Sequence, residues 1–107
     1  MSLRLLEMLE SWANRRQPAL EAAGIRVRVT RGPVDRTPAA MWVDFESKRM
    51  SARLILWSDG QAELTIGDLA QRDVVLDEHR EISSDIGLDD VEATITAWFV
   101  EASRGGE

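Results

Sequence analysis

Apolar and polar residues alternate with two different periods along this chain, and the change of period divides it into elements. The first segment has an apolar residue every three or four positions, as on one face of a helix: Leu5, Leu6, Leu9, Trp12 and Ala13. Ser2 is a candidate N-cap for this helix, and Gly24 is a natural stop at its C-terminus. Because proline lacks an N–H group and clashes with the preceding turn, we expect Pro18 either to kink the helix or to begin a second, short one.

From Ile25 the period changes to two, which is typical of strands with one buried face. Alternation over segments 25–30, 41–46, 52–57 and 62–66 predicts four strands, and Val74-Val75-Leu76, running into the polar stretch 77–81, is a candidate fifth. Residues 31–38 contain Gly32, Pro33 and Pro38 and predict a loop. A single apolar stripe then predicts a last helix, capped by Ser84 or Asp85: Leu88, Val91, Ile95, Trp98, Phe99 and Ala102.

The first hairpin turn fixes a register between two of the strands. If the loop consists of the two residues Lys48-Arg49, Asp44 faces Arg53 and Trp42 faces Ile55 across the strands. Opposite charges directly across a ladder stabilise it by a few tenths of a kcal/mol. The charge pattern therefore favours this register.

The second turn, Ser58-Asp59-Gly60, is read in the same way. A two-residue loop would place Glu63 on the buried face, whereas a three-residue loop with Gly60 in the left-handed conformation places Ala62 opposite Leu56. Because burying an unpaired glutamate costs several kcal/mol, the three-residue loop is predicted.

These elements predict an α+β fold: a meandering antiparallel sheet of four to five strands, with the N- and C-terminal helices packed on one face. The 107 residues suit a single domain, spanning 1–107, with one core. No apolar run is long enough for a membrane span, and the N-terminus alternates charge with leucine too soon for a signal peptide. We therefore expect a soluble, cytoplasmic protein.

Net charge is distributed unevenly along the chain. The total is −6, but residues 1–58 hold ten basic and six acidic residues, whereas residues 59–107 hold three basic and thirteen acidic ones. This asymmetry argues against a nucleic-acid binder, which needs clustered basic charge. It permits a partner with a basic face, although acidic residues that only keep a small protein soluble would give the same total.

Few residues suggest catalysis. There is no cysteine, and His79 is the only histidine, which excludes a thiol nucleophile and a multi-histidine metal centre within one chain. Asp77, Glu78 and His79 are adjacent, but on a strand Asp77 and His79 share one face while Glu78 points the other way. Glycine-rich phosphate loops and EF-hand spacing are also absent. We expect no enzyme, cofactor or metal, and a hydrolase or transferase using Asp77 and His79 is a minor alternative.

The predicted register places unusual side chains on the outer face of the sheet. Trp42, Ile55 and Trp57 point away from the helices, among charged residues that include Asp44 and Glu63. Tryptophan ringed by polar groups is typical of binding hot spots. Either these rings form an interface, or a neighbouring loop folds back over them. Trp12 and Trp98 lie on apolar helix stripes and are predicted to be core residues.

Several short motifs resemble one known family. They are the Leu9–Trp12 step in the leading helix, the strand Met41-Trp42-Val43-Asp44-Phe45-Glu46, the turn Leu56-Trp57-Ser58-Asp59-Gly60-Gln61-Ala62-Glu63, and the segment Glu78-His79-Arg80-Glu81-Ile82-Ser83-Ser84. In this order they are similar to TriTu-type immunity proteins, found beside bacterial polymorphic toxins. Pro18 departs from the unbroken first helix expected of the family.

The resemblance implies an antitoxin that binds a cognate toxin and blocks its NAD or substrate site. The associated toxins resemble ADP-ribosyltransferases that modify elongation factor Tu and are delivered by Rhs, type VI or other contact-dependent systems. We expect a monomer that binds the toxin domain 1:1, without nucleic acid or membrane. The expected contact residues are Trp42, Asp44, Trp57, Glu63, Asp77, Glu78 and His79. An acidic type III secretion chaperone, which would be an obligate homodimer, is the main alternative.

Overall fold

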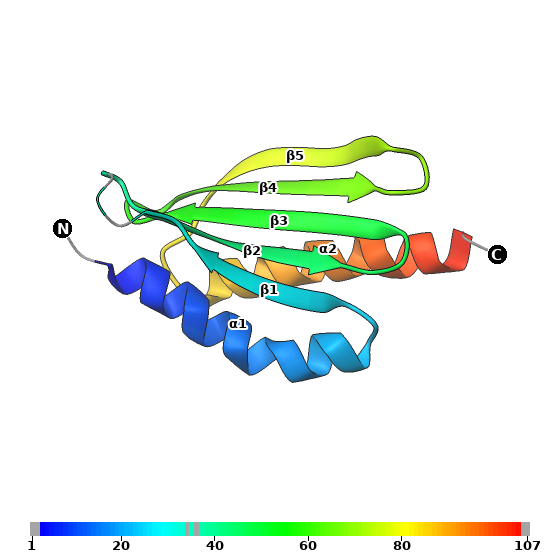
Figure 1. Cartoon of the computed structure of the whole chain (residues 1–107), viewed down its shortest axis with the longest axis horizontal. Coiled ribbons are helices and arrows are strands. Elements are labelled where there is room, and N and C mark those ends of the chain that lie inside the picture. Colours follow the sequence, from blue (N-terminus) through cyan, green and yellow to red (C-terminus); the bar gives the residue numbers. More distant parts are fainter. Residues whose placement is uncertain (1–2, 34, 36, 106–107) are drawn as a thin grey trace.

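The computed structural model describes residues 3–33, 35 and 37–105, with side chains described up to residue 102. The elements, in order, are α1 (Arg4–Ala22), β1 (Arg26–Arg31), β2 (Ala40–Glu46), β3 (Met50–Trp57), β4 (Gln61–Asp68), β5 (Asp73–Glu81) and α2 (Asp85–Gly105). The strands form one antiparallel sheet in the order β1-β2-β3-β4-β5, and both helices lie on the same side of it (Figure 1). This arrangement confirms the α+β prediction, with five strands.

Helix α1 is continuous through Pro18, so no second helix begins there. Pro18 is exposed, so the carbonyl group that loses its helical partner lies on the solvent side. The helix ends where Gly24 predicts: this residue has a φ of +87°, and the N–H of Ile25 donates to the carbonyl of Leu20 at 2.9 Å. This is the Schellman arrangement, which needs a left-handed residue. Ser2, the candidate N-cap, lies outside the described residues.

Both hairpin turns that flank β3 have the predicted geometry. At the first turn the N–H of Ser47 donates to the carbonyl of Met50 at 2.9 Å, which closes a two-residue loop. At the second turn Gly60 has a φ of +94°, and Ala62 lies opposite Leu56. The register over β2, β3 and β4 is therefore the predicted one, and the residues of these strands that face the helices are apolar core residues, apart from Asp68 at the end of β4.

The two outer strands add pairings that the sequence patterns left open. β1 pairs with β2 along its whole length, with Val29 opposite Val43. β5 pairs with β4 and contains an irregularity, because Ile66 faces Leu76 whereas Gly67 faces Val74. This extra residue in β5 is a β-bulge.

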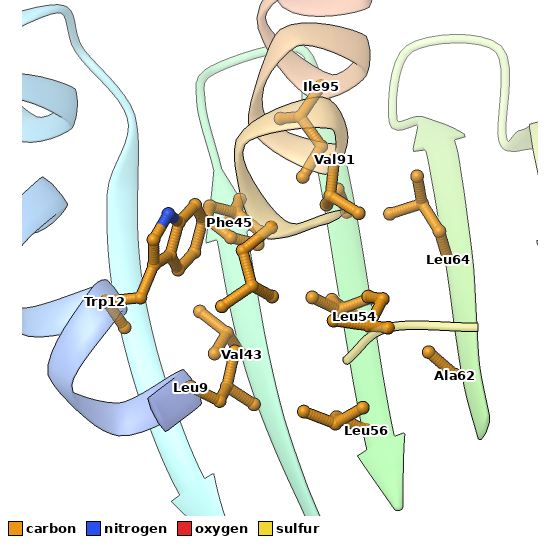
Figure 2. Close-up of a cluster of buried hydrophobic side chains, with 14 of the residues drawn as sticks. Leu9, Trp12, Val43, Phe45, Leu54, Leu56, Ala62, Leu64, Val91 and Ile95 are labelled. Carbon is orange, nitrogen blue, oxygen red and sulfur yellow. The ribbon is translucent and has the colours of Figure 1, made fainter. Parts of the chain in front are cut away.

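The core lies between the sheet and the two helices (Figure 2). Trp12 of α1 packs edge-on against Phe45 of β2, with ring centroids 6.4 Å apart and planes at 72°. The indole N–H of Trp12 donates to the Asp89 carboxylate of α2 at 3.1 Å, and Arg16 forms a bidentate ion pair with Glu92 at 2.7 and 2.8 Å. These polar contacts join the two helices at the edge of the core.

The prediction that Trp98 belongs to the core is wrong, because its surface is 38% exposed. Trp98 lies one helical turn beyond Thr94, whose hydroxyl group accepts a hydrogen bond from Arg80 of β5 at 3.2 Å. It therefore lies on the flank of α2 that faces the outer strand, beside the stripe of Leu88, Val91, Ile95 and Phe99 that fills the core. No helix within the described residues is long and apolar enough to cross a membrane.

Candidate partner-binding face

The two helices cover one face of the sheet, and the other face, here called the open face, carries most of the predicted contact residues. Alternation along each strand sends every second side chain to this face. Because the strands are in register, the side chains form rows that run across the sheet, and one such row is Thr30, Trp42, Ile55, Glu63 and His79.

The centre of the open face is apolar. Trp42, Ile55 and Trp57 are each half-buried, in contrast to the fully buried residues that alternate with them. Gly32 lies close to the Trp42 ring, since a Cβ atom added there would be 3.1 Å from Cζ3 of the indole. The start of the β1–β2 connection thus lies against one edge of Trp42, while Trp42, Ile55 and Trp57 each keep part of their surface exposed.

Ion pairs border this centre on the side of β1, β2 and β3. The guanidinium group of Arg53 donates to both carboxylate oxygens of Asp44, at 2.6 and 3.2 Å, and also lies 5.7 Å from the centroid of the Trp42 ring. Arg26 pairs with Glu46 in the next row. These charges are balanced within the face, so a partner that covers them need supply no counter-charge.

The side formed by β4 and β5 is acidic. Glu63 and Asp77 are diagonal neighbours, and the contact with the Asp77 carboxylate raises the pKa of Glu63, which burial raises further and the charge on His79 lowers. The Thr65 hydroxyl donates to Asp77 at 3.4 Å, and His79 contacts the side-chain carbonyl of Gln61. Within the described residues neither carboxylate forms an ion pair.

Glu78 is separated from the other predicted contact residues. It lies opposite Leu64 and therefore faces the helix side, where Arg80 donates to its carboxylate at 2.7 Å. The structure thus brings together six of the seven predicted residues, Trp42, Asp44, Trp57, Glu63, Asp77 and His79, on one surface. Asp77 and His79 share this surface, but the hydrogen-bond partners described for them are Thr65 and Gln61 rather than each other.

Sequence reasoning did not identify Arg28 and Gln61 as parts of this face. Arg28 lies in the row of Asp44 and Arg53, and Gln61 reaches His79 across the β4–β5 pair. A shallow depression of about 680 Å³ borders Arg28, Arg53 and Val74 at one end of the sheet. Strand alternation was the available signal. In the predicted register of β4 it places Gln61 on the open face, whereas Arg28 can be placed only once the register of β1 is known.

The fold is that of a small α+β protein in which both helices lie on the same side of the sheet. A family model described as "Immunity protein TriTu" matches residues 7–101, and the chain belongs to this family. No curated protein and no solved structure matches the chain. Membership supports an immunity role, which implies binding to a cognate toxin protein.

Proposed function

We propose that this chain neutralises an ADP-ribosyltransferase toxin domain by docking the open face over its NAD or substrate site. The family match supports the immunity role, and the resemblance noted above supports the class of toxin. The toxin would belong to an Rhs, type VI or other contact-dependent system. The immunity protein would act in the cytoplasm of the producing cell, and inhibition would need no catalysis by the chain.

The observation that carries the location of the interface is the apolar centre of the open face. Trp42, Ile55 and Trp57 lie together on one surface, with charged side chains on both sides. Half-buried aromatic rings with a polar surround are the usual form of an interface hot spot, since the surround excludes water once the partner binds. The six contact residues gathered here constitute the proposed site.

We propose a monomer that binds the toxin 1:1. β5 is an outer strand, and it carries Asp73, Asp77, Glu78 and Glu81. Two copies joined through this edge would bring these carboxylates together, and charged side chains on an edge strand oppose such pairing. A mass of about 12.0 kDa for the free chain in light scattering would support the monomer, and a stable homodimer would favour the chaperone alternative.

Replacing Trp42 and Trp57 together by alanine tests the proposed face. Because both rings are only half-buried, we expect a stability loss of about 1 kcal/mol for each substitution and a complete loss of protection in toxin-expressing cells. Trp98→Ala is the matched control, since this indole is exposed on α2 and its removal should leave protection intact. Protection by the folded double variant would exclude the open face as the toxin contact.

The class of toxin is tested separately, with the domain encoded by the adjoining open reading frame. That domain should transfer ADP-ribose from labelled NAD to elongation factor Tu, and one equivalent of this chain should stop the transfer. Transfer that continues at excess immunity protein would refute inhibition, and a domain without this activity would refute the class.

A further inference from the structure

The charged side chains at the two edges of the open face differ in sign. On β1 the charged side chains of this face are Arg26 and Arg28, whereas on β4 and β5 they are Glu63, Asp77 and Glu81, with His79. The basic side is thus one edge strand, and the acidic side is the opposite edge.

Charged side chains nearer the centre of the open face form ion pairs with one another and are therefore not available to a partner. Arg53 forms an ion pair with Asp44, and Arg26 forms one with Glu46. Arg28 lies directly opposite Asp44, yet it forms no ion pair within the described residues, because Arg53 occupies that carboxylate in a bidentate contact. An exposed arginine therefore remains on β1, and the carboxylates of Glu63 and Asp77 remain on the other side of the tryptophans.

We propose that this polarity sets the orientation of the toxin: its surface carries basic side chains over Glu63 and Asp77, and an acidic side chain over Arg28. The inference rests on the proposed function. Between these contacts the partner would cover Trp42 and Ile55 with apolar surface. Complementary charge chiefly accelerates association and suppresses wrong orientations, so the effect should appear in the association rate.

A simpler partner, uniformly basic and attracted by the total charge of −6, makes the opposite prediction at one position. Against a uniformly basic surface Arg28 is repelled, and reversing its charge would accelerate binding. Against the complementary surface proposed here Arg28 is attracted, and reversing its charge would slow binding. Arg28→Glu thus separates the two partners by the sign of its effect.

The experiment measures association rates by surface plasmon resonance against a catalytically inactive toxin domain from the adjoining open reading frame, at low and high salt. The acidic side is tested with Glu63→Gln/Asp77→Asn and the basic side with Arg28→Glu. Asp90→Asn/Glu101→Gln is the matched control, because it removes two exposed carboxylates of α2 with the same change in net charge. Melting temperatures confirm that each variant is folded.

We expect both open-face variants to associate about tenfold more slowly than wild type at low salt, with a weaker salt dependence, while the α2 control changes neither. Faster association of Arg28→Glu, or a Glu63→Gln/Asp77→Asn rate equal to that of the control, would overturn the proposed orientation. If the wild-type chain fails to bind the toxin domain at all, the proposed function itself is wrong.

Discussion

At the scale of single residues, Glu63 illustrates a conflict between stability and the proposed binding. Its carboxylate lies beside that of Asp77 on the open face, and this contact raises the pKa of Glu63. A raised pKa means that the folded state binds the proton more readily than the unfolded chain, so ionisation of Glu63 lowers stability. The same carboxylate is available to a basic partner, whose charge would relieve the repulsion.

The Glu63→Gln variant should therefore be more stable than wild type at neutral pH, although it should bind the toxin more slowly. The cost of ionised Glu63 is present above its folded pKa and disappears as the pH falls through that value, because the wild-type carboxyl group then takes up the proton. Urea unfolding at pH 7 and pH 4 should show a gain in the free energy of unfolding that is larger at pH 7. With Glu101→Gln as control, a loss of stability at pH 7 would contradict the described contact.

At the scale of the elements, prediction succeeded where turns fixed the register. The two hairpins around β3 are short and contain residues with defined turn chemistry, so alternation alone gave the faces of β2, β3 and β4. The long connection 32–39 leaves the register of β1 open. The bulge beside Gly67 does the same for β5, because one extra residue exchanges the faces of the strand.

The helices show a second limit of pattern reasoning. A helical stripe shows which side of the helix faces the core, but it does not show how many residues on either side of the stripe are also buried. That number depends on how many strands lie beneath the helix. Two helices cover five strands here, so Trp98, on the flank of its stripe, stays exposed while Phe99 is buried. Similarly, Pro18 was expected either to kink α1 or to begin a second, short helix, and no second helix begins there because α1 continues through this exposed position.

The turn glycines allow a matched test at this scale. Gly60 and Gly24 both have positive φ, and alanine at either position is strained by about 1 kcal/mol. A Cβ atom at Gly60 would also lie 3.2 Å from the carbonyl oxygen of Ile82, whereas at Gly24 nothing lies within 4 Å. Urea unfolding should show a loss of about 2 kcal/mol for Gly60→Ala and about 1 kcal/mol for Gly24→Ala. Equal losses of stability in the two variants would mean that the turn at Gly60 moves far enough to avoid the contact with the Ile82 carbonyl oxygen.

At the scale of the whole molecule, the two faces of the sheet differ in what they contact. One face and both helices enclose the core, so its residues are fixed by packing. The open face makes no contribution to that core and carries two tryptophans, internally paired charges at its centre and exposed charges of opposite sign at its edges. The excess of acidic residues in the second half of the chain thus contributes, in part, the acidic side of the proposed binding surface.

The most direct test of this account asks which face the toxin covers. Because the chain contains no cysteine, a thiol introduced at one position reports on that position alone. Thr65 lies on the open face and Thr96 on α2, and both are half-buried, so Thr65→Cys and Thr96→Cys form a matched pair. The measurement is the rate of thiol alkylation with and without the toxin domain. Binding should strongly slow alkylation at position 65 and leave the rate at position 96 unchanged. Protection of position 96 with position 65 unaffected would contradict the proposal that the toxin covers the open face.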